Sequence, residues 1–153
     1  MQGGVEMVYG YPDYQSELGN INLRIESCET GIRMNERKIR KLREALSELK
    51  IEYNKLENHI EDFKNNLCEV EDWQGTRYWE HVNEVNRVRK MLYSYNWEIE
   101  ESITSIEDEI EELETGISSK KSEIKKLNSR RNQLRKEAKK KKSLENPLGS
   151  GTY

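Results

Sequence analysis

The sequence predicts an all-α fold, a long antiparallel coiled-coil hairpin made of two helices. Apolar residues recur at alternating spacings of three and four residues from Leu18 to Val70 and again from Tyr78 to Ala138, which is the pattern of a heptad seam. Charged residues make up 36% of the chain and apolar residues only 33%, so a narrow seam is expected rather than a broad core. No proline interrupts either seam.

The first helix is expected near residues 15–71, after a flexible N-terminus at 1–14 that contains glycine and tyrosine. Its seam has one polar interruption, Asn35. A turn is expected at 72–75, where Asp72 is a suitable N-cap for the next helix and Gly75 allows a backbone angle that other residues resist.

The second helix is expected near 76–141, with the hairpin as a whole at 15–141 and a disordered tail at 142–153. Its seam keeps the same register through four polar positions. These are Arg89, Asn96, Lys120 and Arg131. Asn96 and Arg89 would be partly exposed to solvent in an isolated hairpin. An additional helix packed over this region would supply their hydrogen-bond partners.

Charge favours a hairpin over a single rod that pairs with another chain. Residues 98–114 hold nine acidic residues and no basic residue, whereas residues 31–47 hold six basic residues and two acidic ones. A turn near residue 72 brings these two segments opposite each other. Because each exposed ion pair contributes only about 0.2–1 kcal/mol, the match selects register and direction more than it adds stability.

Aromatic side chains mark the candidate binding residues. Two tryptophans, Trp73 and Trp79, flank Gly75 and Tyr78 at the expected turn, where a slender hairpin offers little surface to pack on. A second group lies outside the intramolecular seam of the second helix, at Tyr93, Tyr95 and Trp97. Exposed aromatics are favoured at protein interfaces. The alternative is that they only widen the core of the hairpin.

Catalysis and metal binding have no support in the sequence, so no enzyme activity, cofactor or metal is expected. His59 and His81 are isolated, and neither Cys28 nor Cys68 has a metal-ligand spacing. The two cysteines are too far apart on one helix to pair, which suggests a reducing compartment.

No apolar run approaches the ~20 residues that cross a bilayer, and no secretory signal precedes the helices, so we expect a cytoplasmic protein.

The segment 120–142 is strongly basic, with twelve Lys and Arg against Glu123 and Glu137. Such a helix could attract nucleic acid or an anionic membrane. The net charge of −3 and the absence of aromatic residues among these bases make nucleic acid an unlikely partner. A solvated helix end, or a dock for an acidic partner helix, is favoured.

The tripeptide Trp73-Gln74-Gly75 at the tip of a helical hairpin, within WQGTRYWEHV, resembles the WXG family of bacterial type VII secretion. More particularly, the chain resembles the longer YwqH-like proteins that accompany LXG-domain toxins. The resemblance implies a hairpin that binds a related helical hairpin. It also implies that the tryptophan of the turn contributes to recognition by the secretion machinery. The Tyr-x-x-x-Asp/Glu signal of this route is missing after the second helix, so a partner is expected to carry the signal or to share in forming it.

The favoured function is therefore a non-catalytic partner, chaperone or targeting factor for a larger LXG-type effector. Such a protein acts in the cytoplasm and could be exported with its partner. The alternatives are a self-associating coiled-coil scaffold, which would form a homo-oligomer, and an adaptor that uses its basic segment to bind nucleic acid or membrane.

Overall fold

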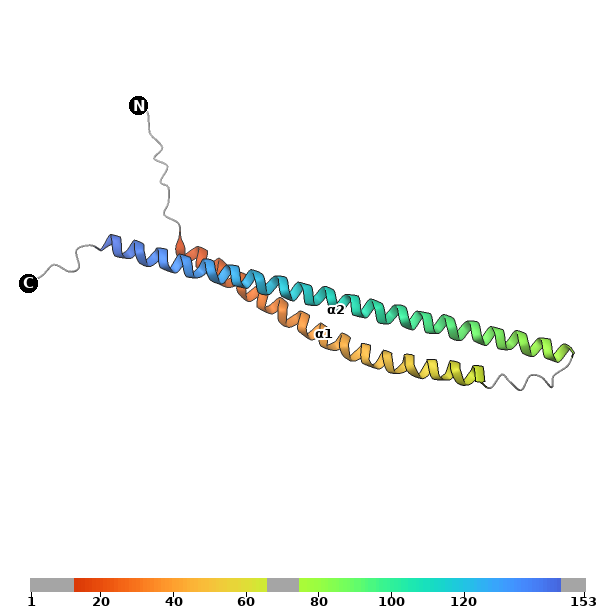
Figure 1. The fold of residues 1–153 in the computed structure, drawn as a ribbon. Coiled ribbons are helices and arrows are strands. Elements are labelled where there is room, and N and C mark those ends of the chain that lie inside the picture. The colour runs from red at the N-terminus through yellow and green to blue at the C-terminus, as the bar shows by residue number, and fades with distance from the viewer. Residues whose placement is uncertain (1–12, 66–74, 147–153) are drawn as a thin grey trace, which may run out of the picture. The chain divides into compact units, whose positions relative to one another are not determined.

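The computed structural model describes residues 13–65 and 75–146, which form two long helices (Figure 1). Helix α1 spans Tyr14–Asn65 and helix α2 spans Thr76–Glu145. Neither described range contains a strand. The all-α prediction is confirmed. Residues 72–74 of the turn expected at 72–75, and residues 66–71 at the expected end of the first helix, lie outside the described residues.

Helix α1 begins at Tyr14 because Asp13 caps it. The backbone N–H of Ser16 donates to Oδ1 of Asp13 at 3.2 Å, and the N–H of Glu17 donates to the carbonyl oxygen of Asp13 at 3.0 Å. Glu17 also places a negative charge in the first turn, where the helix dipole favours it. This cap sets the start of the helix one residue before the expected position at 15.

Helix α2 begins directly after Gly75, whose φ of +80° is the left-handed conformation that glycine adopts most easily. The N–H of Tyr78 donates to the carbonyl oxygen of Gly75 at 3.1 Å and closes the first turn. At its other end α2 runs beyond 141 to Glu145, so residues 142–145 are helical rather than part of a tail. Lys141 and Glu145 form an i,i+4 ion pair at 3.9 Å, and the next break in the sequence is the Asn146-Pro147 dipeptide.

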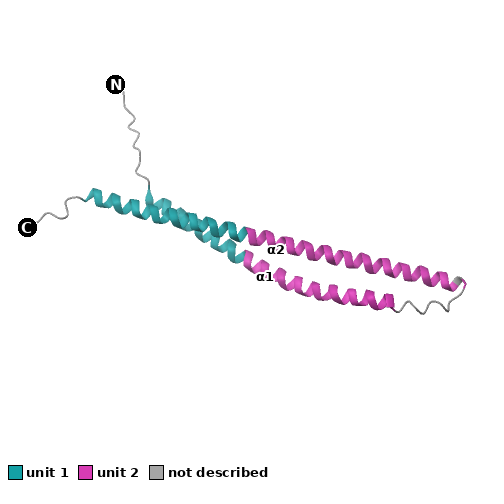
Figure 2. Ribbon diagram, in the orientation of Figure 1, with its two compact units in different colours: residues 1–34, 116–153 teal, residues 35–115 magenta. Residues whose placement is uncertain are grey.

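The chain divides into two compact units, each built from part of α1 and part of α2 (Figure 2). Unit 1 contains residues 1–34 and 116–153, of which 13–34 and 116–146 are described. Its core is a cluster of four buried residues, with Tyr14, Leu18 and Ile124 packed against it. The four are Ile21, Ile25, Leu127 and Leu134.

Ion pairs across unit 1 show that its two helices run in opposite directions. Arg24 contacts Glu123 at 2.7 Å, and Glu17, one heptad earlier in α1, contacts Arg130, one heptad later in α2, at 3.0 Å. Arg131 donates to Asn22 of α1 at 3.1 Å and to Asn128 of its own helix at 2.7 Å. This half-buried arginine therefore keeps its terminal nitrogens bonded although it stands in the apolar seam.

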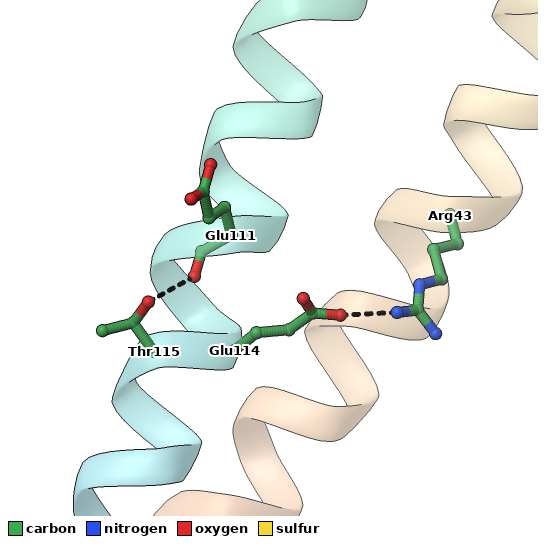
Figure 3. Close-up of polar contacts among 4 residues, drawn as sticks. All are labelled: Arg43, Glu111, Glu114 and Thr115. Carbon is green, nitrogen blue, oxygen red and sulfur yellow. Dashed lines mark hydrogen bonds and ion pairs between the residues drawn. The ribbon is translucent and has the colours of Figure 1, made fainter.

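Unit 2 contains residues 35–115, of which 35–65 and 75–115 are described. Three glutamates of α2, seven residues apart, reach α1 at successive levels. Glu114 accepts from Arg43 at 2.5 Å (Figure 3), Glu107 from Lys50 at 2.9 Å and Glu100 from the hydroxyl of Tyr53 at 2.5 Å. Unit 2 is therefore antiparallel as well, as the predicted hairpin requires, and acidic α2 faces basic α1.

The predicted seam matches the burial of the described residues at every position but one. Apolar seam residues are buried or half-buried, and so are the polar Asn35, Asn96, Lys120 and Arg131. Arg89 is the exception, because its side chain is exposed and Val88 beside it is half-buried. A long arginine side chain can carry its guanidinium from the seam edge into water, so Arg89 does not need the partner that the sequence suggested.

Candidate protein-interaction surface

The predicted site residues near the turn have unequal surroundings. Trp73 lies outside the described residues. Gly75 is exposed, and Tyr78 is half-buried at the start of α2. The ring of Tyr78 meets that of Trp79 in an edge-to-face contact, with centroids 5.5 Å apart and planes at 77°. Trp79 nevertheless stays 64% exposed, so this contact supports one side of the indole and leaves the other uncovered.

The aromatic residues of α2 do not lie on one surface. Trp79 and Trp97 are eighteen residues apart, which is about five full turns, and Tyr93 lies one turn before Trp97. These three form one flank of the helix beside the seam, called here the aromatic flank. Tyr95 lies one turn after Met91 on the opposite flank. Helical periodicity thus divides the docking surface that the sequence suggested into two.

Both flanks are exposed to an extent unusual for large apolar side chains. On the aromatic flank Trp97 is 57% exposed and Tyr93 is 44% exposed. On the other flank Met91 is 62% and Tyr95 is 59% exposed. The seam residues between them, such as Leu92, are half-buried and Ile99 is buried. These aromatics therefore do not widen the core of the described hairpin, which removes the alternative interpretation of them.

The aromatic flank continues onto α1 through Lys64. Its ammonium nitrogen lies 5.4 Å from the centroid of the Tyr93 ring, within the range of a cation–π contact. An open hollow lies at this level between the helices. It is lined by Glu57, Ile60, Glu61 and Lys64 of α1 and by Tyr93 and Asn96 of α2.

Asn96 gives this hollow an unsatisfied acceptor. Its Oδ1 is buried, yet it has no hydrogen-bond partner among the described residues. A buried acceptor without a donor costs roughly 1–3 kcal/mol, so such groups are rare in folded proteins. Glu57 and Glu61 line the same hollow. The arrangement suits a donor, and a cationic donor best.

The sequence identified Tyr93 and Asn96 but missed their neighbours on α1. Glu57, Glu61 and Lys64 occupy unremarkable positions in a charged helix. The only signal that could have found them was the antiparallel register, which places the end of α1 opposite the residues near 93. That register was predicted from charge blocks too coarse to pair individual residues.

Two side chains of α1 have a raised pKa, Cys28 and Tyr53. Burial, and then the neighbouring Glu123 carboxylate, raise the pKa of the Cys28 thiol, which disfavours the nucleophilic thiolate. Hydrogen bonds to Glu100 and Glu57 raise the pKa of Tyr53.

Residues 13–65 and 75–146 contain no cluster of three His, Cys, Asp or Glu side chains that could hold a metal ion. Within the same ranges neither helix has an apolar stretch that could cross a membrane.

A family model matches most of the chain. The model of the YwqH-like family matches residues 16–145, which covers both helices almost from end to end. Neither curated proteins nor solved structures give a match.

Proposed function

The chain belongs to the YwqH-like family, and on that premise we propose that it is a non-catalytic helical partner, serving as chaperone or targeting factor for a larger LXG-type effector of type VII secretion. The proposal combines the family with the resemblance of Trp73-Gln74-Gly75 to the WXG turn. In this scheme the protein binds its effector in the cytoplasm and leaves the cell with it.

The observation that carries the proposal is the aromatic flank of α2 beside the hollow at Asn96. Trp79, Tyr93 and Trp97 present large, rigid apolar surface to solvent, and residues of this kind dominate the energetics of protein interfaces. Tyr93 and Trp97 are spaced to receive one face of a partner helix. The buried Oδ1 of Asn96, which has no hydrogen-bond partner among the described residues, lies in the hollow that Tyr93 also lines.

These features define the chemistry of the partner surface. An apolar side chain of a partner helix packs between Tyr93 and Trp97, and an Arg or Lys one turn away enters the hollow. There the cation donates to Oδ1 of Asn96 and pairs with Glu57 or Glu61. Arginine is the better fit, because its guanidinium can also stack on an aromatic ring.

The turn has a separate role in this proposal. Trp73 and Gly75 form the feature that the secretion machinery recognises, whereas the aromatic flank binds the effector. Gly75, with its positive φ, fixes the direction in which the chain enters α2. Loss of Trp73 should therefore affect export of the complex and not its formation.

The decisive experiment is to purify the tagged protein from its native host as wild type and as three variants, and to identify the recovered proteins by mass spectrometry. The double variant Tyr93→Ala/Trp97→Ala should lose a larger helical protein that carries a toxin-like C-terminal domain. The matched control Met91→Ala/Tyr95→Ala, on the opposite flank, should retain it. Trp73→Ala should also retain it but lower its amount in the culture medium.

Three results would contradict the proposal. Recovery of the protein alone from wild-type cells would favour the self-associating scaffold. Recovery of nucleic acid or membrane fragments, lost in high salt, would favour an adaptor that acts through residues 120–142. Equal recovery of the effector by the Tyr93→Ala/Trp97→Ala variant would move the docking surface away from the aromatic flank.

A further inference from the structure

The two units carry opposite net charges. The described residues of unit 1 contain fourteen Lys and Arg against seven Asp and Glu, a net charge of +7. The described residues of unit 2 contain twelve Lys and Arg against eighteen Asp and Glu, a net charge of −6. The overall charge of −3 hides this separation.

In unit 1 the excess positive charge lies on the outward side of α2. The outward heptad positions from Ser118 to Lys140 hold only Lys, Ser, Asn and Gln, and all of them are exposed. The lysines among them, called here the basic face, are Lys125, Lys126, Lys136, Lys139 and Lys140. Only two acids lie near this face within the described residues of α2 in unit 1 before Lys141, and both have a bonded partner: Glu123 binds Arg24 of α1, and Glu137 accepts a hydrogen bond from Gln133.

In unit 2 the excess negative charge also lies on the outward side of α2. Glu100, Glu107 and Glu114 point across to α1 and are bonded there. The remaining outward acids, called here the acidic face, are Glu98, Glu101, Asp108, Glu111 and Glu112. All five are exposed, and their carboxylates form no ion pair with any described residue. Their backbone carbonyls do accept hydrogen bonds, as that of Glu111 does from Thr115 (Figure 3).

We propose that the acidic face of one copy of the chain binds the basic face of a second copy. The two faces are complementary in sign, lie on the same helical positions, and are always present in equal amounts because one chain carries both. This contact is independent of the aromatic flank and of the effector.

The composition of the basic face argues against other anionic partners. It has no aromatic residue on which a nucleobase could stack. It has no apolar residue that could insert into the boundary of a bilayer. A second copy instead offers five exposed carboxylates as the ligand of this face.

The test is sedimentation velocity of the full-length protein at a range of concentrations in about 50 mM and about 500 mM NaCl. The Debye length falls to about half or less over this range, so the dissociation constant of the self-complex should rise at least about tenfold. A wild-type protein that is monomeric at low salt would overturn the proposal. So would self-association that does not respond to salt.

Charge reversal identifies the faces. The variant Lys125→Glu/Lys136→Glu/Lys140→Glu and the variant Glu101→Lys/Asp108→Lys/Glu112→Lys should each be monomeric, with unchanged helix content by circular dichroism because all six side chains are exposed. An equimolar mixture of the two should regain a complex, because the first variant keeps an intact acidic face, the second keeps an intact basic face, and the two reversed faces are also opposite in sign. A mixture that stays monomeric while wild type associates would exclude this pairing. A wild-type monomer that instead binds a DNA oligonucleotide or vesicles with anionic lipid would assign the basic face to that polyanion.

Discussion

Arg43 of α1 donates to the carboxylate of Glu114 of α2 at 2.5 Å, across 71 residues of sequence (Figure 3). Both side chains are at least half exposed, so water and salt screen their attraction. Arg43→Ala and Glu114→Ala should each lower the free energy of unfolding by less than about 1 kcal/mol. A double-mutant cycle in urea should give a coupling of about 0.2–1 kcal/mol that shrinks in high salt. A coupling of zero would mean that the two residues do not pair in solution.

Among residues 13–65 and 75–146, Leu134 is the one side chain with no exposure at all, and it lies in the core of unit 1. Leu134→Ala should lower the free energy of unfolding by about 2–4 kcal/mol, because it removes buried apolar surface and leaves a cavity. Leu144→Ala is the matched control, since Leu144 is 79% exposed on the same helix, and its effect should stay within about 0.5 kcal/mol. Equal effects in urea denaturation would contradict the described packing of unit 1.

Three glycines should respond differently to alanine. A Cβ at Gly19 would meet open space, so Gly19→Ala should raise the free energy of unfolding by about 0.5–1 kcal/mol through helix propensity. A Cβ at Gly31 would lie 2.6 Å from Cε of Lys120, whose flexible side chain must move, so the gain there should be smaller. Gly75→Ala should lower stability by about 1 kcal/mol, because its φ of +80° is strained for any other residue. Thermal and urea unfolding would measure all three, and a stabilising Gly75→Ala would contradict the backbone at the start of α2.

Cys28 should react slowly with thiol reagents in the folded protein. Burial and the Glu123 carboxylate raise the pKa of its thiol, so less thiolate is present at any given pH than for a free cysteine. In a Cys68→Ser background, alkylation of Cys28 should be slow at neutral pH. It should accelerate only at a pH above the ordinary pKa of a cysteine thiol. Alkylation in denaturant supplies the control rate. Native and denatured rates that coincide would show that the thiol is accessible.

Glu123 should make unit 1 sensitive to acid. The hydrogen bond from Arg24, at 2.7 Å, lowers the pKa of this carboxyl below its ordinary value of 4.5. Because the pKa of this carboxyl is lower in the folded state than in the unfolded state, its charge stabilises the folded protein above pH 4.5. That stabilisation is lost as the pH falls through the folded-state pKa. Glu123→Gln should therefore be less stable than wild type at neutral pH, and the difference should disappear in acid. A difference that is constant with pH would assign the loss to packing instead.

The sequence alone predicted most of the fold because the heptad pattern is redundant. Each seam residue from Leu18 to Phe63 independently indicates the same helical face, and all of them are buried or half-buried. The direction of pairing followed from the acidic block at 98–114 and the basic block at 31–47. Arg89 is where the pattern failed, because spacing reports the position of a Cα and not the path of a long side chain into water.

The candidate site was only partly predictable from the sequence. Tyr93, Tyr95 and Trp97 were correctly placed outside the seam, but their near adjacency in the sequence suggested a single surface. A rotation of about 100° per residue sends Tyr95 to the flank opposite Tyr93 and Trp97. The role of Trp73 remains a prediction, since it lies outside the described residues.

What the sequence determined by itself is the helical class, the seam and the antiparallel sense. These depend on the spacing of apolar residues and on the distribution of charge along the chain, and both can be counted in the sequence. Only the tertiary structure decided which individual residues meet. The partners of Glu100, Glu107 and Glu114, the hollow beside Lys64 and the unsatisfied oxygen of Asn96 depend on the axial register of α1 against α2. A seam that repeats every heptad is compatible with several such registers, and packing between the helices selects one of them.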